Sequence, residues 1–375
     1  MQIIVDDQVF TFQRYGGVSR YFAELVSQYR QSPELGVEVH TPFRYVLNEY
    51  LLRSDPVRYR HAPLPARIQR GRVLRGLNTK RESLRSLASG RPAPGIVHHT
   101  FYFTPALAQP ARARLCTVYD MIPELFPELF PGIAPHAAKD EYVQACQALL
   151  CISHTTKADL LRHYGSLDKP VVVTPLGVTG NFFAAPPVDV SESPYLLFVG
   201  QRGAYKNFEV LLRAFARLRD SSPRLRLVCV GGTPFDETEL SRIAELDATG
   251  RVSRIGMDDG NLPSMYAGAV AFVFPSRYEG FGLPIVEAFA AGCPVVLADT
   301  PCSVEVGGES AQFFPADDDE RLAEILAPLV GDLGQQGSRA GWIERGRLRA
   351  RDYTWRRTAE LTRDVYRDLD LRYPA

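Results

Sequence analysis

Short apolar runs alternate with longer amphipathic stretches along most of the 375-residue chain. Apolar runs of strand length in the first half are residues 3–5, 37–41, 96–98, 115–119, 148–152 and 171–175. Between them lie stretches such as "SRYFAELVSQYR" and "HTTKADLLRHYG", whose apolar residues recur at helical spacing. Strands that alternate with helices in this way predict an α/β fold with a doubly wound parallel sheet.

The same alternation restarts in the second half. "PYLLFVG" (194–200) predicts a buried strand and "NFEVLLRAFARLRD" (207–220) an amphipathic helix, and further strands are expected at 224–232, 252–256, 271–276, 293–299 and 311–318. We therefore expect two Rossmann-like domains, 1–178 and 179–352, that face each other across a cleft. The segment 176–194, rich in proline and serine, would link them. The amphipathic segment 353–375 could close the second domain or pack back on the first.

Composition excludes some classes of protein. The 43 Lys and Arg residues balance 43 Asp and Glu residues, so net charge gives no reason to expect a nucleic-acid partner. The start, "MQIIVDDQVF", lacks the basic region and long apolar core of a signal peptide, and no window approaches a membrane span. We therefore expect a cytoplasmic protein. The six cysteines form no C-x-x-C pair and are interpreted as reduced and structural.

One tract departs from this balance. Between Arg53 and Arg91 the chain carries eleven Lys and Arg residues against two acids, with apolar residues interleaved. Two interpretations stay open. The tract could be a solvated basic helix face, or it could be a surface that meets anionic lipid headgroups or a phosphate-bearing acceptor, at the inner face of the cytoplasmic membrane.

The motif "VGQRGAYKN" (199–207) joins a predicted strand to a predicted helix. A helix N-terminus that follows a strand through a tight loop presents free backbone N–H groups and a positive dipole end to an anion. Arg202 and Lys206 add two cations at the same place. They would suit a phosphate, although either could also be simply solvated.

A second strand-to-helix loop is "RYEGFG" (277–282). Glu279 lies in this loop and Glu287 lies on the following helix, which would start at Pro284. Gly280 and Gly282 would let the backbone approach a ligand, with the amides of nearby residues pointing outward. The alternative is that Glu279 is a surface acid and that Glu287 caps or solvates a helix.

Taken in order, these motifs resemble those of the retaining glycosyltransferases of family 4, which have the GT-B fold. The spacing of the glutamates in "EGFGLPIVE" looks like the family's donor-site signature, and "GQRGAYKN" resembles its phosphate site. Further stretches, "FQRYGGVSRYFAEL", "VYDMIPELFPE", "CISHTTKADL" and "TPLGV", resemble loops of its first domain. The resemblance covers nearly the whole chain, and it implies a nucleotide-diphosphate sugar as the donor, with no cofactor and no metal.

The resemblance implies roles for individual residues. Arg202 and Lys206 would bind the donor diphosphate, and Glu287 would hydrogen-bond the ribose hydroxyls. Glu279 and the amides of Phe281 and Gly282 would hold the sugar, while the amide of Leu283 would meet a phosphate. The expected catalytic residues are Glu279, Asp120, Lys206 and Arg202, and further donor contacts are expected at Gly16, Gly17, Tyr119, Gly231, Gly232 and Met257. Such cations and amides stabilise a leaving group without a metal.

Tyr119 departs from the family pattern. Many members carry His-Asp where this chain has Tyr119–Asp120, and their histidine contacts the donor sugar. A tyrosine can donate a hydrogen bond but does not titrate near neutral pH, so the histidine's role is in doubt here, and the sugar could be altered, for example a deoxy sugar. His98 and His99 end a strand, where histidines belong to the core or a cleft rim more often than to a catalytic site.

The leading hypothesis is a retaining, metal-independent glycosyltransferase of bacterial surface polysaccharide synthesis, such as that of lipopolysaccharide or exopolysaccharide. Its acceptor would be lipid-linked or a saccharide. "FQRYGGVSR" and "RGAYKN" resemble mannosyl- and rhamnosyltransferases, so GDP-mannose or a related GDP-sugar is the first expected donor, followed by UDP- and dTDP-sugars. An oxidoreductase is disfavoured because no G-x-G-x-x-G follows the first strand of either half. A non-catalytic nucleotide- or glycan-binding module is expected to have lost the cations or carboxylates of the cleft. All four are present here, as Arg202, Lys206, Glu279 and Glu287.

Overall fold

The computed structural model describes residues 1–63, 71–89, 95–130, 137–186, 188–219, 221–256, 260–331 and 337–374. The chain forms two compact units. The first unit is Met1–Leu176 with Trp355–Ala375, and the second is Gly177–Thr354. The sequence analysis placed the corresponding divisions at 178/179 and 352/353.

The first unit is built on a six-stranded parallel sheet with the order β2-β1-β3-β4-β5-β6. Its strands are β1 (Gln2–Val5), β2 (Glu38–His40), β3 (Ile96–His99), β4 (Ala113–Val118), β5 (Ala148–Cys151) and β6 (Val171–Val173). All six strands predicted from the first half of the sequence are therefore confirmed. The longer helices are α1 (Gly17–Gln31), α2 (Glu49–Ser54), α3 (Gly71–Ser89), α5 (Ala137–Ala145) and α6 (His154–Tyr164), with a short α4 (Ile122–Leu125). Single 3-10 turns are η1 (Val9–Thr11), η2 (Pro33–Leu35), η4 (Thr104–Ala108) and η5 (Pro127–Leu129).

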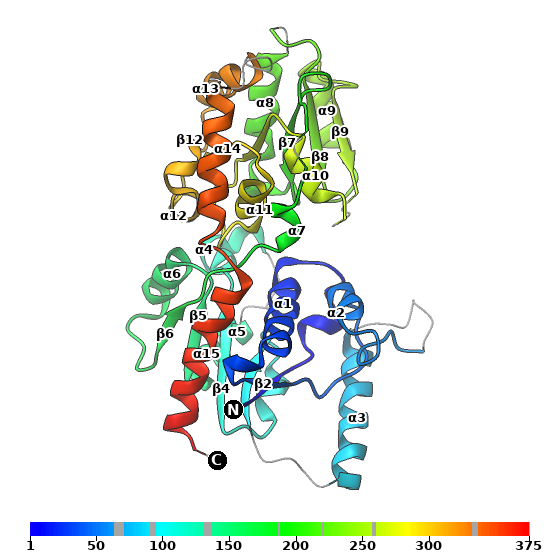
Figure 1. Ribbon diagram of the computed structural model, residues 1–375, viewed down its shortest axis with the longest axis vertical. Coiled ribbons are helices and arrows are strands. Elements are labelled where there is room, and N and C mark those ends of the chain that lie inside the picture. The colour runs from blue at the N-terminus through cyan, green and yellow to red at the C-terminus, as the bar shows by residue number, and fades with distance from the viewer. Residues whose placement is uncertain are drawn as a thin grey trace. The chain divides into compact units, whose positions relative to one another are not determined.

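The C-terminal helix α15 (Trp355–Arg372) belongs to the first unit. It lies against α1, as its red ribbon shows in Figure 1. The Tyr29 hydroxyl of α1 donates to the carbonyl of Ala359 at 2.8 Å. The Tyr366 hydroxyl lies 2.6 Å from Nδ1 of the buried His98 on β3. Of the two placements that the sequence left open for this helix, the structure has the one on the first unit.

The second unit has another six-stranded parallel sheet, with the order β12-β11-β10-β7-β8-β9. Its strands are β7 (Tyr195–Val199), β8 (Arg226–Val230), β9 (Val252–Ile255), β10 (Ala271–Phe274), β11 (Val295–Ala298) and β12 (Gln312–Phe314). Its helices are α7 (Gly180–Phe183), α8 (Phe208–Leu218), α9 (Glu237–Glu245), α10 (Leu262–Ala267), α11 (Leu283–Ala291), α12 (Pro301–Gly307), α13 (Asp319–Gly331) and α14 (Gly337–Ala350), with 3-10 turns η6 (Ala204–Lys206) and η7 (Gly308–Ser310). The predicted doubly wound α/β fold is thus confirmed in both halves.

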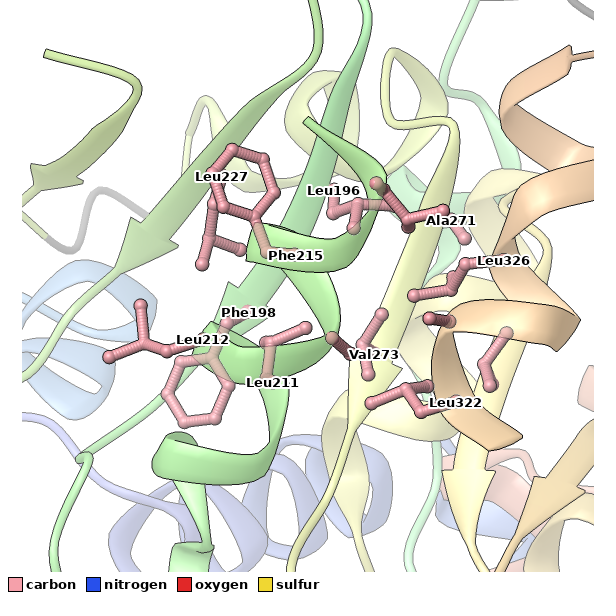
Figure 2. Packing of buried hydrophobic residues seen from close by; sticks show 14 of the residues in the cluster. Leu196, Phe198, Leu211, Leu212, Phe215, Leu227, Ala271, Val273, Leu322 and Leu326 are labelled. Atoms are coloured by element: carbon pink, nitrogen blue, oxygen red, sulfur yellow. The ribbon is translucent and has the colours of Figure 1, made fainter. Parts of the chain in front are cut away.

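The inner strands β7, β10 and β11 of the second sheet contain only apolar and aromatic residues, as expected of parallel strands that helices cover on both faces. Figure 2 shows how alternate residues of β7 and β10, including Phe198 and Val273, pack under α8 and α13. These helices contribute Phe215 and Leu326, among others, to the same buried cluster. Each such side chain stabilises the fold by roughly 1.5–3 kcal/mol through burial. This layer holds the ends of β7 and β10, and therefore the loops that follow them, in fixed positions.

The prediction that 176–194 is a linker with little regular structure is wrong. This segment contains α7 and packs within the second unit. Phe182 is 2% exposed, with its ring 6.0 Å from that of Tyr266, and Val190 lies in the core cluster. The apolar residues interspersed among the prolines and serines explain the difference, because burying them stabilises the chain more than leaving them in a solvated connection.

The six cysteines all lie in described segments and are buried free thiols, as expected. None of the helices in the described segments is long and apolar enough to cross a membrane.

In each sheet the order of strands reverses direction at one point. The chain moves outward from β1 to β2 and then continues on the other side of β1 with β3. It likewise moves from β7 through β8 to β9 and then resumes beside β7 with β10. Ligands of open α/β sheets bind outside the carboxyl ends of the strands at such switch points. The residues that follow β1, β3, β7 and β10 are therefore the first places to look for a site.

Candidate active site

Lys206 and Glu279 meet at the switch point of the second sheet. Lys206 follows β7 and Glu279 follows β10, and Nζ of Lys206 lies 2.5 Å from Oε1 of Glu279. The side chains are 18% and 13% exposed. The amide of Arg277 donates to the carbonyl of Tyr205 at 2.8 Å, which ties the two loops together. The sequence analysis assigns Lys206 to a phosphate and Glu279 to a sugar, and the structure brings these two side chains into direct contact.

The loop that carries Glu279 turns sharply into α11. Gly282 has φ +89°, and a Cβ there would lie 2.7 Å from Cδ1 of Ile285, so both conformation and space favour glycine. Phe281 is buried, and its carbonyl accepts a bond from Sγ of Cys302 at 3.1 Å. The helix begins at Leu283, one residue before the predicted start. Since the first N–H groups of a helix have no partner within it, the amides at this end suit an anion.

Glu287 lies one turn into α11 and is only 3% exposed. The Tyr266 hydroxyl of α10 donates to Oε2 of Glu287 at 3.2 Å. The residues of α11 from Ile285 to Ala291 are buried, so Glu287 is an acid in an otherwise apolar helix. Burying a carboxylate is unfavourable unless a specific partner compensates. The alternative that Glu287 merely caps or solvates a helix is therefore wrong, because it is buried and α11 has no side-chain cap.

Arg202 is held by the protein itself. Nε of Arg202 donates to Oε1 of Glu239 at 2.6 Å, and Nη2 donates to the carbonyl of Thr233 at 2.6 Å. The guanidinium carbon lies 4.6 Å from the ring centre of Phe235, and the side chain is 3% exposed. The alternative that Arg202 is simply solvated is therefore wrong. Its Nη1 is buried without a hydrogen-bond partner among the described residues.

The turn after β8 approaches Arg202 closely. Gly231 and Gly232 have φ values of +82° and +64°. A Cβ at Gly232 would lie 2.8 Å from Nη1 of Arg202 and 3.0 Å from the carbonyl of Gly200, so this position requires glycine. The structure thus brings Gly232 and Arg202, two of the predicted donor-site residues, close together. Met257, the other predicted contact from this side, lies outside the described residues.

Gly16 and Gly17 lie at the start of α1 in the first unit, after β1. A Cβ at Gly16 would lie 2.4 Å from Cδ of Gln13, whereas nothing opposes one at Gly17. Oε1 of Gln13 accepts a hydrogen bond from the amide of Ser19 at 2.8 Å. Gln13 therefore provides a partner for one amide at the N-terminus of α1, and the amides that remain are those of the glycine turn.

Tyr119 and Asp120 follow β4. The Tyr119 hydroxyl donates to the carbonyl of Thr100 at 3.3 Å, and burial raises the pKa of Tyr119 well above its usual value. Oδ1 of Asp120 accepts a bond from the amide of Ile122, the first residue of α4, at 3.0 Å. Tyr119 is therefore a neutral donor engaged within the unit, which differs from a titrating histidine that faces a sugar.

An acid–base pair that the sequence did not reveal lies at the switch point of the first sheet. Nδ1 of His99, at the end of β3, lies 2.7 Å from Oδ2 of Asp6, just after β1. His99 is 2% exposed, and its Nε2 has no hydrogen-bond partner among the described residues. The only sequence signal was that each residue directly follows or ends an apolar run, and sequence alone does not show that β1 and β3 are neighbours.

Ser276 was also missed. It lies between β10 and Glu279, is 1% exposed, and its Oγ has no hydrogen-bond partner in the described segments. A buried hydroxyl without a partner is rare in proteins. Together with Nη1 of Arg202 it is a second polar atom near these loops that the protein does not satisfy. No group of three or more His, Cys, Asp or Glu side chains is arranged to hold a metal ion within the ranges described.

Comparison with known proteins agrees with this geometry. The model for glycosyl transferases group 1 matches residues 183–349, which contain Arg202, Lys206, Glu279 and Glu287. The model for glycosyltransferase family 4 matches residues 15–180, which contain Gly16, Gly17, Tyr119 and Asp120. The two models together therefore account for both units of the structure.

The curated relatives of this chain are distant in sequence. The chain is 28% identical to an O-antigen chain mannosyltransferase B from Escherichia coli over 242 residues, 61% of this chain and 62% of the relative. It is 34% identical to the MMP alpha-(1->4)-mannosyltransferase of Mycolicibacterium hassiacum over 225 residues, 58% of this chain and 53% of the relative. The chain thus spans less than two thirds of the length of these curated relatives.

A solved structure resembles nearly the whole chain. Anabaena HepE, solved in complex with UDP and glucose, matches with a TM-score of 0.73 and 17% identity over 98% of this chain and 100% of that one. At this identity the likeness concerns the fold, which is GT-B. With both units matched by family models and by this architecture, the chain belongs to the glycosyltransferases of family 4.

Proposed function

We propose that this protein is a retaining, metal-independent glycosyltransferase that takes its sugar from a nucleotide-diphosphate sugar. The observation that carries the proposal is the Lys206–Glu279 pair at the switch point of the second sheet, beside the N-terminus of α11. A cation, a carboxylate and free helix amides at one place suit the phosphates and the sugar hydroxyls of such a donor.

Each group would have a separate task. Nζ of Lys206 and the amides at the start of α11 would stabilise the negative charge on the departing nucleoside diphosphate. Glu279 would accept hydrogen bonds from sugar hydroxyls and would hold Lys206 in position. Glu287, oriented by Tyr266, would bind the ribose hydroxyls.

The reaction exchanges one bond to the anomeric carbon for another. The bond from C1 to the phosphate oxygen breaks, and the acceptor hydroxyl forms the new bond on the same face. The proton of that hydroxyl passes to the leaving phosphate. No side chain is assigned as a nucleophile, because Glu279 already pairs with Lys206 and serves to hold the sugar.

The names of the relatives support a mannosyl donor first. Both relatives described above are mannosyltransferases by name, and one acts on O-antigen chains. GDP-mannose or a related GDP-sugar is therefore the first proposed donor, and a lipid-linked or saccharide acceptor of surface polysaccharide synthesis is the proposed acceptor. The complex of HepE with UDP and glucose supports a UDP-sugar as the second candidate.

A panel of ligands tests the nucleotide. Thermal unfolding of the full chain is measured with GDP, UDP, dTDP and NAD, each well above its expected Kd. A nucleoside diphosphate at 100 times its Kd should stabilise the protein by about 2.7 kcal/mol. Stabilisation by NAD with none by any nucleoside diphosphate would contradict the proposal.

A product assay tests the reaction. Donor sugars are incubated with candidate acceptors, the product is identified by its mass, and the anomeric configuration is determined by NMR. Retention of the donor configuration and unchanged turnover with EDTA are expected. An inverted product or loss of activity with EDTA would refute the corresponding part of the proposal, and nucleotide binding without turnover on any acceptor would favour a binding module.

A further inference from the structure

We propose that the first unit carries a second anion site, a phosphoryl-binding cavity formed by Arg44, Arg58 and Arg81 beside the edge strand β2. The cavity has a volume of about 390 Å³, and the other residues that matter for its chemistry are His40, Phe43 and Asp55. A volume of 300–1,000 Å³ is typical of small-molecule sites. Every residue of this cavity belongs to the first unit, so it is formed without Lys206 or Glu279.

Local structure explains why two of the arginines lie together. Asn78, on α3, is 4% exposed, and its Oδ1 accepts hydrogen bonds from the amides of Arg44 at 3.2 Å and Tyr45 at 2.9 Å. Nδ2 of Asn78 returns a bond to the carbonyl of Tyr45 at 3.0 Å. Arg81 lies three residues after Asn78 and therefore on the same helix face. The segment after β2 is thus fixed against α3 at the point that brings Arg44 and Arg81 to one cavity.

Positive charge exceeds negative charge in this cavity. Asp55 is its carboxylate, and Oδ2 of Asp55 lies 3.6 Å from both Arg58 and Arg30. Within the part of the chain that the structure describes, neither Arg44 nor Arg81 has a carboxylate partner. Three guanidinium groups that share one carboxylate leave an excess of two positive charges, and an anion relieves the repulsion between them.

A neighbouring cavity provides an internal comparison. This second cavity, about 490 Å³ in volume, shares His40 and Arg58 with the first. It is lined by Arg30 and also by Glu38, and it lacks Arg44 and Arg81. Its lining contains two arginines, whereas that of the first cavity contains three. The number of guanidinium groups, and not the volume, therefore distinguishes the first cavity.

The chemistry favours a phosphate ester or diphosphate over a carboxylate. One guanidinium group can donate two parallel hydrogen bonds to two oxygens of a phosphate. Several guanidinium groups around one cavity therefore suit a ligand group that has three or more oxygens. Two apolar residues, Phe43 and Val57, line the same cavity. Phe43 is buried and stacks on Tyr59 with ring centres 5.6 Å apart, whereas Val57 is 83% exposed. The phosphoryl group could come from a lipid headgroup or from a soluble compound, and its use by an acceptor substrate, unlike its binding, rests on the proposed function.

Titration calorimetry with inorganic pyrophosphate tests the site. The full chain with Lys206→Ala is the parent, because this change removes one of the two proposed donor-side cations and so weakens competing binding at that site, where Arg202 remains. Adding Arg44→Gln and Arg81→Gln should weaken pyrophosphate binding at least tenfold. The matched control adds Arg72→Gln and Lys80→Gln, two exposed cations on the same helix that do not line the cavity, and should leave binding within about twofold of the parent.

Vesicles separate the two sources of phosphate. Flotation of the same variants is compared on vesicles of phosphatidylglycerol with phosphatidylcholine and of phosphatidylcholine alone. Loss of pyrophosphate binding in the Arg44→Gln, Arg81→Gln variant supports the site, and additional loss of flotation on the anionic vesicles, absent in the control, assigns it to lipid.

If the parent binds neither probe, or if both variants bind alike, the proposal is overturned. A variant with Arg44→Lys and Arg81→Lys keeps the charge and provides a folded alternative if the glutamine variant unfolds. This variant should bind pyrophosphate with intermediate affinity, since lysine cannot form paired bonds. Equal affinity of the lysine variant and the parent would also contradict the assignment to guanidinium groups. Turnover of the unaltered protein is independent of all these measurements, so failure here leaves the proposed transfer reaction intact.

Discussion

Each sheet places a carboxylate beside a nitrogen-bearing side chain at its switch point, but the two pairs differ in burial and in their hydrogen bonds. At the first, the side chains of Asp6 and His99 are 7% and 2% exposed, and Asp6 accepts five hydrogen bonds from Gln8, His99 and Thr100. At the second, the side chains of Lys206 and Glu279 are 18% and 13% exposed. A carboxylate with five donors has no capacity left for a ligand, whereas a partly exposed pair can exchange its partner. The comparison indicates that the first pair stabilises the fold, and it supports the proposed role of the second pair in binding substrate.

The ionisation of the first pair agrees with a structural role. Burial by itself would raise the pKa of Asp6, but hydrogen bonds from His99, Thr100 and Gln8 together with the nearby His99 hold it below its usual value. The adjacent Asp7 shows the opposite shift, since burial raises its pKa to about 6 despite a bond from Asn78. Two neighbouring carboxylates are therefore separated in acidity by their hydrogen-bond partners.

The largest effect is expected from Asp6→Asn. Asparagine has the same shape as aspartate but lacks the negative charge to which His99 and four other donors are hydrogen-bonded. The free energy of unfolding should therefore fall by about 3–5 kcal/mol. Urea unfolding followed by circular dichroism measures the loss. Asp247→Asn, the same change at an 87% exposed carboxylate, is the control and should alter stability by less than about 0.5 kcal/mol. Equal losses of stability at Asp6 and Asp247 would contradict the conclusion that the Asp6–His99 pair stabilises the fold.

Lys206→Ala should act on turnover and not on stability. Loss of one preorganised charge next to the leaving group should reduce kcat by about 10²–10³, or about 2.7–4 kcal/mol. Steady-state kinetics with the donor identified by the screen gives the value, and the melting temperature shows whether the fold is intact. Lys80→Ala, an exposed lysine of α3, should retain full turnover. An unchanged kcat in Lys206→Ala would exclude the proposed role of this pair.

A smaller effect, dependent on pH, is expected from Asp7→Asn. Because the pKa of Asp7 is raised to about 6 in the folded protein, the folded state holds a proton between pH 4 and 6 that the unfolded chain releases. This contribution to stability is present at pH 4 and is lost as the pH rises through 6. Asparagine does not titrate, so the variant should gain about 1–3 kcal/mol relative to the unaltered protein between pH 4 and pH 7. Urea unfolding at both pH values tests this. If the variant and the unaltered protein differ in stability by the same amount at pH 4 and pH 7, the pKa of Asp7 is not raised.

The smallest effect is expected from Glu287→Gln. The amide can still accept a bond from Tyr266 but binds ribose hydroxyls less strongly than a carboxylate, so nucleotide affinity should fall about fivefold, or about 1 kcal/mol. Calorimetry with the free nucleoside diphosphate measures the change. Tyr266→Phe serves as a companion variant, because a similar loss there would show that the orientation of Glu287 matters. An unaltered Kd in Glu287→Gln would show that Glu287 does not bind the ribose.

The strands and most helices could be predicted from the sequence because their signals are local. The apolar runs that became β7 and β10, and the amphipathic stretch that became α8, carry their own periodicity. The same holds for the turn at Gly282, where one residue type satisfies φ +89°. The short helix α7 was missed because proline and serine around it indicate a loop, while the burial of Phe182 depends on Tyr266 far along the chain.

The sequence by itself therefore determined two doubly wound sheets, the loops after their strands, and the family that these loops resemble. Only the tertiary structure decided which charges meet. Lys206 and Glu279 lie 73 positions apart, and Asp6 and His99 lie 93 apart, so their contacts depend on which strands are neighbours. It also decided that Arg202 is held by Glu239 and that α15 packs on the first unit. The physical reason is that backbone conformation follows from neighbouring residues, whereas ion pairing and burial follow from the order in which strands assemble.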